Sequence, residues 1–102
     1  MNGQSFAFNG YLPVKPHERK AKIKELEKRS RNGKQSQIFI ETPYRNDAML
    51  ADILEVCEAS TRVCVAADIT LPSAYIKTRR VQDWRQNRVT IGKRPCVFIL
   101  MA

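Results

Sequence analysis

"IFIETPYRND", residues 38–47, places an apolar run directly before a dense group of polar side chains. Apolar residues at the consecutive positions 38–40 predict a strand that is covered on both faces, since neighbouring strand residues point to opposite sides. Asn46 is a good helix N-cap and Asp47 is favourable in a first helical turn, so a helix is expected to follow. The polar residues 41–45 therefore lie at the end of a buried strand.

Working outward from this stretch, the sequence predicts alternating strands and helices. In chain order we expect an extended segment at 5–13, a helix at 14–30, a strand at 37–42, a helix at 48–60, strands at 62–70 and 71–81, a helical turn at 81–87, and a last strand at 93–102. Such alternation favours right-handed βαβ units. We therefore predict an α/β fold with a mixed, mostly parallel sheet of about five strands and helices on both faces. The polar strand 71–81 is expected at an antiparallel edge.

The two long helices differ in their apolar faces. The helix at 48–60 carries Leu50, Ile53, Leu54 and Cys57 at the spacing of one helical face, which indicates a well-buried amphipathic helix. The helix at 14–30 has only a narrow apolar edge and many charges, so most of its surface should face solvent.

Length, charge and hydropathy limit the class of protein. The 102 residues suit one domain and carry a formal net charge of +8. Two basic blocks, at 15–34 and 77–94, favour a polyanionic partner such as nucleic acid, although a solvated helix face explains the first block equally well. The sequence has no apolar run long enough to span a membrane and no secretory signal, so we expect a cytoplasmic protein with no membrane association.

The cysteines and the histidine give little sign of metal or redox chemistry. Cys57, Cys64 and Cys96 are odd in number and form no CxxC motif. We therefore predict buried free thiols. The sole histidine, His17, lies in a charged stretch far from the cysteines, so no metal site is expected.

Polar residues at strand ends are the candidate functional site. In open α/β sheets, ligands bind beyond the carboxyl ends of parallel strands. If the strands ending near 41 and 67 are parallel neighbours, Glu41, Thr42, Asp68 and Thr70 share one rim. The segment "GKRP", residues 92–95, lies at the same rim or the opposite one, depending on the direction of the last strand.

These residues also have a purely structural interpretation. Glu41 can pair with Arg45, and Asp68 and Thr70 can cap a turn before Pro72. The sequence lacks a phosphate-cradling glycine motif and a convincing nucleophile–histidine arrangement. Glu41 and Asp68 alone are a weak signal for a carboxylate pair. The chain therefore looks like half of a site more than a complete enzyme.

Four collinear stretches carry a resemblance to a known family. They are "FAFNGYLPVKPHERKAKIKELE", "QIFIETPYRN", "RVCVAADITLPSAYIKT" and "GKRPCVFILM". Together they resemble the C-terminal domain of the tetrapyrrole-methylase-like (class III) S-adenosylmethionine-dependent methyltransferases. The branch they are most similar to comprises the bacterial small-subunit ribosomal RNA cytidine 2′-O-ribose methyltransferases. The residues that match the motifs of that branch are Phe6, Phe8, Gly10, Tyr11, Leu12, Pro13, Glu41, Arg45, Ala66, Asp68 and Thr70.

The resemblance implies a two-domain enzyme of which residues 1–102 are the C-terminal half. The N-terminal, glycine-rich donor-binding domain is absent from this sequence. The resemblance further implies methyl-donor contacts from the strand ends, at Glu41, Thr42, Ala66, Ala67, Pro95 and Cys96. It also implies two partners for this domain. One is the N-terminal domain of the same chain, and the other is a second copy of the protein in a homodimer.

Some residues depart from the pattern of the branch. Thr42, Pro43 and Tyr44 stand where that branch tends to have serine, threonine and histidine. Leu71 and Pro72 stand where a lysine is typical. These departures concern the substrate side more than the donor side.

The leading hypothesis is a methyltransferase that acts on a ribose 2′-hydroxyl of ribosomal RNA, within the small subunit. S-adenosylmethionine is its expected donor and no metal is expected. Glu41 and Asp68 are candidate catalytic residues. The expected RNA contacts are Lys15, Arg19, Lys20, Lys22 and Arg45. The alternatives are a methyltransferase of a tetrapyrrole or another small molecule, and a non-enzymatic basic RNA-binding module.

Overall fold

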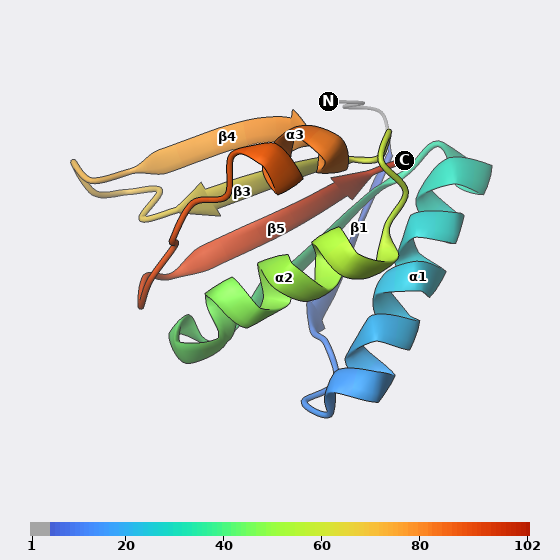
Figure 1. The fold of residues 1–102 in the computed structure, drawn as a ribbon, viewed down its shortest axis with the longest axis horizontal. Coiled ribbons are helices and arrows are strands. Elements are labelled where there is room, and N and C mark those ends of the chain that lie inside the picture. The colour runs from blue at the N-terminus through green and yellow to red at the C-terminus, as the bar shows by residue number, and fades with distance from the viewer. Residues whose placement is uncertain (1–4) are drawn as a thin grey trace.

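A computed structural model describes residues 5–102, so residues 1–4 of the predicted domain lie outside the described part. Its elements occur in the predicted order (Figure 1). They are β1 (Phe6–Tyr11), α1 (Pro16–Gly33), β2 (Ser36–Glu41), a 3-10 turn η1 (Pro43–Arg45), α2 (Asn46–Val56), β3 (Arg62–Ala67), β4 (Tyr75–Arg80), α3 (Val81–Gln86) and β5 (Cys96–Met101).

The five strands form one mixed sheet in the order β1-β2-β5-β3-β4. The pairing of β1 with β2 is parallel, while β2–β5, β5–β3 and β3–β4 are antiparallel. The prediction of a mixed sheet with the polar strand as an antiparallel edge is confirmed. The prediction that the sheet is mostly parallel is wrong at the level of pairing. β5 runs opposite to β2 and β3 and lies between them, so it separates two strands that share a direction.

The helices cover one face of the sheet, so the prediction of helices on both faces is wrong for the described residues (Figure 1). The crossovers from β1 to β2 and from β2 to β3 advance across the sheet in the same direction. Two right-handed crossovers that advance in one direction place their helices on the same side. Phe39 accordingly lies fully buried beneath the helices, whereas Ile38 and Ile40 point to the other side and are only half-buried.

The face without helices is mostly apolar, and we call it the open face. The strand register places its side chains in three rows: Phe6, Ser36, Met101, Arg62 and Arg80, then Phe8, Ile38, Ile99, Cys64 and Thr78, and then Tyr11, Ile40, Val97, Ala66 and Ile76. Phe6, Phe8 and Tyr11 in β1 and Ile76 in β4 are each at least 60% exposed. The two edge strands therefore carry the most exposed apolar residues of this face.

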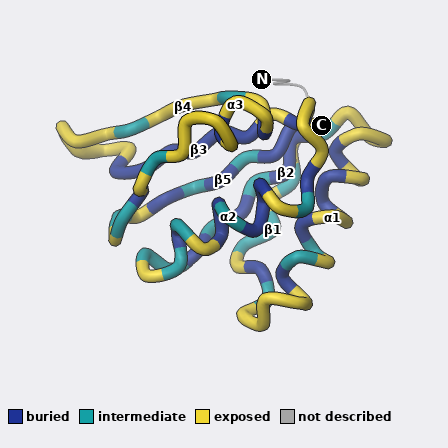
Figure 2. Tube along the Cα trace, viewed as in Figure 1, coloured by how far each residue is buried: buried dark blue, intermediate teal, exposed yellow. Residues whose placement is uncertain are grey.

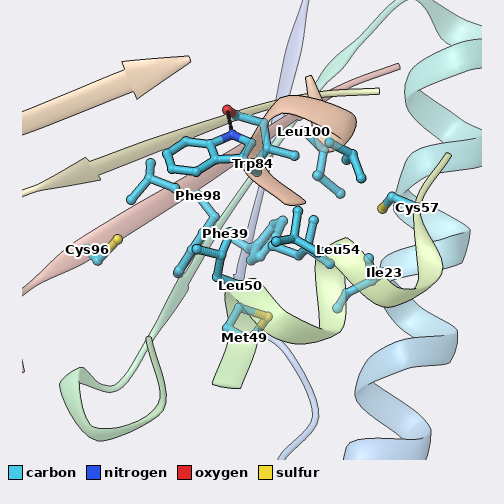
Figure 3. Packing of buried hydrophobic residues seen from close by; sticks show 14 of the residues in the cluster. Ile23, Phe39, Met49, Leu50, Leu54, Cys57, Trp84, Cys96, Phe98 and Leu100 are labelled. Atoms are coloured by element: carbon cyan, nitrogen blue, oxygen red, sulfur yellow. Dashed lines mark hydrogen bonds between the residues drawn. The ribbon is translucent and has the colours of Figure 1, made fainter. Parts of the chain in front are cut away.

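The core lies between the sheet and its helices (Figure 3). Phe39 of β2 and Phe98 of β5 stack with ring centroids 5.6 Å apart. Trp84 of α3 is fully buried, and its indole Nε1–H donates a 3.0 Å hydrogen bond to the Val63 carbonyl. A buried indole needs such a partner for its only donor. Trp84 therefore fixes α3, the helical turn expected at 81–87, on β3.

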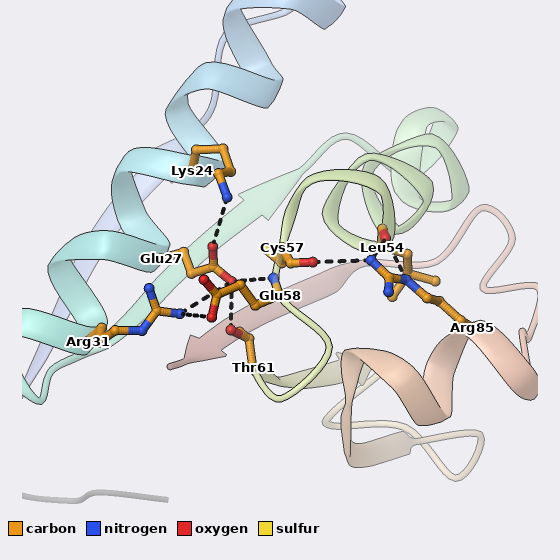
Figure 4. Close-up of polar contacts among 8 residues, drawn as sticks. All are labelled: Lys24, Glu27, Arg31, Leu54, Cys57, Glu58, Thr61 and Arg85. Carbon is orange, nitrogen blue, oxygen red and sulfur yellow. Dashed lines mark hydrogen bonds and ion pairs between the residues drawn. The ribbon is translucent and has the colours of Figure 1, made fainter.

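A buried glutamate joins α1 to the loop before β3 (Figure 4). Glu27 is 1% exposed, and its carboxylate accepts hydrogen bonds from the Thr61 hydroxyl at 2.6 Å and the Glu58 N–H at 2.8 Å. Burial by itself would raise the pKa of Glu27. The hydrogen bonds from Thr61 and Glu58 outweigh burial and hold that pKa below its usual value. The helix predicted to dock by a thin apolar edge thus docks through a charged residue as well.

No helix in residues 5–102 is long and apolar enough to cross a bilayer.

Candidate functional site

The ends of three strands meet at one rim of the sheet. Glu41, the last residue of β2, is paired with Cys96, the first residue of β5. Cys96 is paired on its other side with Ala67, the last residue of β3. The strand ends therefore converge as the sequence predicted, although β2 and β3 are not neighbours. Residues 92–95, which the sequence placed at either this rim or the opposite one, lie at this rim, directly before Cys96.

A cavity of about 370 Å³ lies at this rim. It is lined by Tyr11, Ile40, Glu41, Pro43, Asp68, Ile69, Thr70, Leu71, Pro95, Cys96 and Val97. A mostly apolar wall with a few polar groups is typical of small-molecule sites, whose volumes start at about 300 Å³.

Glu41 is the polar group of the cavity with unused hydrogen-bonding capacity. Its side chain is 2% exposed. One carboxylate oxygen, Oε1, accepts a 2.7 Å hydrogen bond from the Thr42 N–H and lies 3.7 Å from Arg45 Nη1. The other oxygen, Oε2, is buried and has no partner among the described residues. A buried carboxylate oxygen without a donor is costly, so Oε2 would gain from a hydrogen-bond donor that reached it.

Asp68, the other candidate carboxylate, is already engaged. Its backbone has φ 51°, a left-handed conformation that aspartate tolerates better than most residues, and its N–H donates to the Pro95 carbonyl at 3.0 Å. Its carboxylate accepts a 3.2 Å hydrogen bond from the Ser73 hydroxyl and lies 3.6 Å from Arg94 Nη1. Asp68 therefore shapes the turn after β3, in agreement with the structural alternative.

The segment before β5 is fastened to the start of α2. The Asn46 amide donates to the carbonyls of Gly92 and Arg94 at 3.1 and 2.6 Å. The Asp47 carboxylate accepts from the N–H groups of Ile91 and Gly92 at 2.7 and 3.1 Å. Asn46 is thus the first residue of α2 and not its N-cap, so that prediction is wrong. Its side chain finds partners across the fold instead of in its own helix.

The predicted donor contacts divide into two groups. Glu41, Pro95 and Cys96 line the cavity. Thr42, Ala66 and Ala67 are adjacent to the rim in sequence or register but do not line the cavity.

The sequence did not identify Tyr11, Pro43, Ile69 and Leu71 as cavity residues. Ile69 and Leu71 are about half exposed despite being large and apolar. Their position next to Asp68, between a strand end and a proline, was the signal available in the sequence.

The thiol at the rim is not a nucleophile at neutral pH. Burial raises the pKa of Cys96 to about 12, so the thiol stays protonated. All three cysteines are buried and free, as predicted. Within residues 5–102 no group of three His, Cys, Asp or Glu is arranged to hold a metal ion.

The predicted RNA contacts on α1 are less available than the sequence suggested. Arg19 is 5% exposed and pairs with Asp52, so its guanidinium is poorly placed to meet a phosphate in solution. Lys20 pairs with Glu55 at 2.8 Å and Lys22 with Glu25 at 3.1 Å. The other predicted contacts are Lys15, which is exposed, and Arg45, which lies near Glu41.

Comparison with known proteins finds similar sequences and similar structures among methyltransferases. The chain is 39% identical over 66 residues to "Ribosomal RNA small subunit methyltransferase I" of Vibrio cholerae, a match that covers 65% of the chain and 22% of that protein. The match thus spans about a fifth of the length of that curated relative. No protein-family description matches the chain.

Solved structures give the fold. The methyltransferase CobJ superposes with a TM-score of 0.57 at 19% identity, over 97% of this chain and 41% of that one. Uroporphyrin-III C-methyltransferase from Thermus thermophilus, solved in complex with S-adenosylhomocysteine, gives 0.58 at 11% identity, over 99% and 44%.

The chain shares the α/β fold of these two methyltransferase structures. By sequence it is similar to a part of a protein named as a ribosomal RNA methyltransferase.

Proposed function

We propose that this chain is the C-terminal domain of an S-adenosylmethionine-dependent methyltransferase and forms one wall of its donor site. The observation that carries the proposal is the cavity at the rim shared by β2, β3 and β5, whose lining includes Glu41, a buried carboxylate with one oxygen, Oε2, that has no partner among the described residues. The other wall would come from a glycine-rich N-terminal domain outside these 102 residues.

The cavity suits a donor of this kind. Tyr11, Leu71 and Pro95 give apolar surface for a flat ring, and Glu41 Oε2 offers an acceptor for an amine or hydroxyl. When bound, S-adenosylmethionine supplies an electrophilic methyl group. The residues of this chain would orient the donor and exclude water, which is how positioning lowers the barrier of an in-line transfer. Between the two candidate carboxylates, Glu41 is the better acceptor, because Asp68 is occupied by Ser73 and Arg94.

The acceptor we propose is a ribose 2′-hydroxyl of small-subunit ribosomal RNA. The support is the 39% identity to a ribosomal RNA methyltransferase, together with the net charge of +8. A tetrapyrrole or another small molecule is the second candidate, favoured by the structural likeness to uroporphyrin-III C-methyltransferase. An RNA-binding module without enzymatic activity is the third, and donor binding separates it from the other two.

The test is calorimetric titration of the full-length protein with S-adenosylmethionine, with Glu41→Gln as the variant. A hydrogen bond to a charged group contributes about 1.5–3 kcal/mol, so the variant should bind the donor roughly ten- to a hundredfold more weakly. Asp83→Asn is the matched control, since Asp83 is exposed on α3 and does not line the cavity. Absence of donor binding to the full-length protein would refute the proposal.

The proposal includes a homodimer in the cytoplasm. Its support is the open face, whose half-buried and exposed apolar side chains exceed what a solvated sheet normally carries. A second copy of the protein or its own N-terminal domain would cover this face.

A further inference from the structure

The positive charge of the chain is concentrated in its second half. Residues 1–61 hold ten basic and eight acidic residues, a net charge of +2. Residues 62–102 hold eight basic and two acidic residues, a net charge of +6. The basic helix α1 carries seven basic and three acidic residues, a net charge of +4, but residues 35–61 hold one basic and five acidic residues and offset that charge within the first half.

Acidic partners neutralise α1. The α1 cations that lie within ion-pair distance of a carboxylate are Arg19, Lys20, Lys22, Lys24, Arg29 and Arg31. Their partners come from α1 itself, from α2 and from the loop that follows α2. A phosphate approaching α1 would have to compete with these carboxylates.

The edge strand β4 is different. Lys77, Arg79 and Arg80 have no carboxylate within ion-pair distance among the described residues, and Lys77 and Arg80 are exposed. Figure 2 shows β4 exposed along most of its length. Exposed cations without acidic partners are the ones that attract a polyanion.

The cations of β4 lead to the cavity. Tyr75, Lys77 and Arg79 point to the same side of β4, about 7 Å apart along the strand. Tyr75 is paired with Ala67 at the rim, and the Arg94 guanidinium lies 5.7 Å from the Tyr75 ring centroid. Arg94, which is paired with Asp68 of the cavity wall, is followed by Lys77 and Arg79 in a line that runs from the rim along the helix-covered side of β4, and we call this line the β4 track.

Two of these guanidinium groups are held in place. Arg79 lies 4.9 Å from the Trp84 ring centroid, and Arg94 Nε donates to the Ile91 carbonyl at 2.7 Å. Stacking and hydrogen bonding reduce the rotamer freedom that a phosphate contact would otherwise remove.

We infer that the β4 track binds the sugar-phosphate backbone of single-stranded RNA and directs it to the cavity. A single line of cations on one strand matches one phosphate backbone, whereas a duplex presents two. The inference deepens the proposed function by naming the surface that holds the acceptor, and it rests on that function only in taking RNA as the acceptor.

The test compares the salt dependence of RNA binding between the full-length wild-type protein and variants of the track. The probe is a short single-stranded RNA of mixed sequence, followed by fluorescence anisotropy between about 50 and 200 mM salt. For single strands the slope of log K against log salt changes by about 0.7 per phosphate contact. Lys77→Gln should therefore reduce the slope by about 0.7, and Lys77→Gln with Arg79→Gln by about 1.4.

The control removes the same charge from α1. Lys20→Gln with Lys22→Gln should leave the slope unchanged, because Lys20 is paired with Glu55 and Lys22 with Glu25. A reduction of the slope in this control that equals or exceeds the reduction in the track variants would overturn the inference. So would an unchanged slope in the single variant Lys77→Gln, whose exposed side chain is not needed for folding. Basic residues on an edge strand also prevent unwanted sheet pairing, and that role alone predicts an unchanged slope.

Donor titration separates this inference from the proposed function. Lys77 and Arg79 do not line the cavity, so S-adenosylmethionine should bind both variants as it binds the wild type. Salt-dependent RNA binding on the track without donor binding would sustain the inference and refute the proposed function. Donor binding together with an unchanged salt slope of RNA binding in the track variants would sustain the proposed function and refute the inference. That result would favour a small-molecule acceptor.

Discussion

The Asn46 side-chain amide donates a 2.6 Å hydrogen bond to the Arg94 backbone carbonyl, 48 residues further along the chain. The segment before β5 contains no regular structure, so its place beside the cavity depends on such side-chain contacts. The first residue of α2 thus positions the rim from which Pro95 and Cys96 line the cavity.

Loss of this contact should destabilise the fold. Asn46 is fully buried, so Asn46→Ala leaves two carbonyls without their donor. The two carbonyls belong to half-buried residues, so each lost hydrogen bond costs about 0.5–1.5 kcal/mol, and we expect the free energy of unfolding in urea to fall by about 1–3 kcal/mol. Asn32→Ala, at an exposed position of α1, is the matched control and should change it little. Equal effects of the two variants would show that the contact contributes nothing.

Glu27 should make the free energy of unfolding depend on pH in the acidic range. Its pKa is below the usual 4.5 in the folded protein, so the folded state favours the ionised form. The associated stability is fully present above about pH 4.5 and is lost as pH falls through the lowered folded pKa. Urea unfolding at a series of pH values should show this decline, and it should be weaker in Glu27→Gln.

Glu27→Gln should also be less stable than the wild type at pH 7, because Gln offers a weaker acceptor to Thr61 and to the Glu58 N–H. Glu18→Gln, at an exposed position of α1, should keep the wild-type pH profile. A Glu27→Gln profile as steep as that of the wild type would assign the acid sensitivity to another group.

The cysteines should resist alkylation in the folded protein. Burial raises the pKa of both Cys57 and Cys96 to about 12, so very little thiolate exists at pH 8. Iodoacetamide labelling followed by mass spectrometry should be slow in buffer and complete in urea. Labelling of Cys96 at the same rate in both conditions would mean that the rim opens readily.

The open face should control self-association. Phe6 and Phe8 are about 65% exposed on β1, and replacing both with serine removes apolar surface without disturbing the core. Analytical ultracentrifugation should show a lower apparent mass for Phe6→Ser with Phe8→Ser at equal concentration. Val14→Ser, which removes a 60% exposed apolar residue outside the sheet, should behave like the wild type. An unchanged mass of the double variant would contradict a dimer through this face.

Much of the local structure of this protein could be predicted from the sequence. The order and type of the strands and α-helices follow from hydrophobic periodicity, because the alternation of apolar residues records which side of a strand or helix is buried, whereas the 3-10 turn η1 was not predicted. The polar pattern of residues 75–80 placed β4 at an edge, and the strand ends at Glu41 and Asp68 marked the site. These are local signals, and local physical chemistry is enough to interpret them.

Only the tertiary structure decided which strands are neighbours. Periodicity tells which residues share a face but not the direction or order of strands, since these depend on crossovers between distant segments. The insertion of β5 between β2 and β3 brings Cys96 between Glu41 and Ala67. The two crossovers advance in the same direction, which leaves one sheet face bare. The pairing of Arg19 and Lys20 with carboxylates of α2 likewise depends on packing, and the sequence alone does not show it.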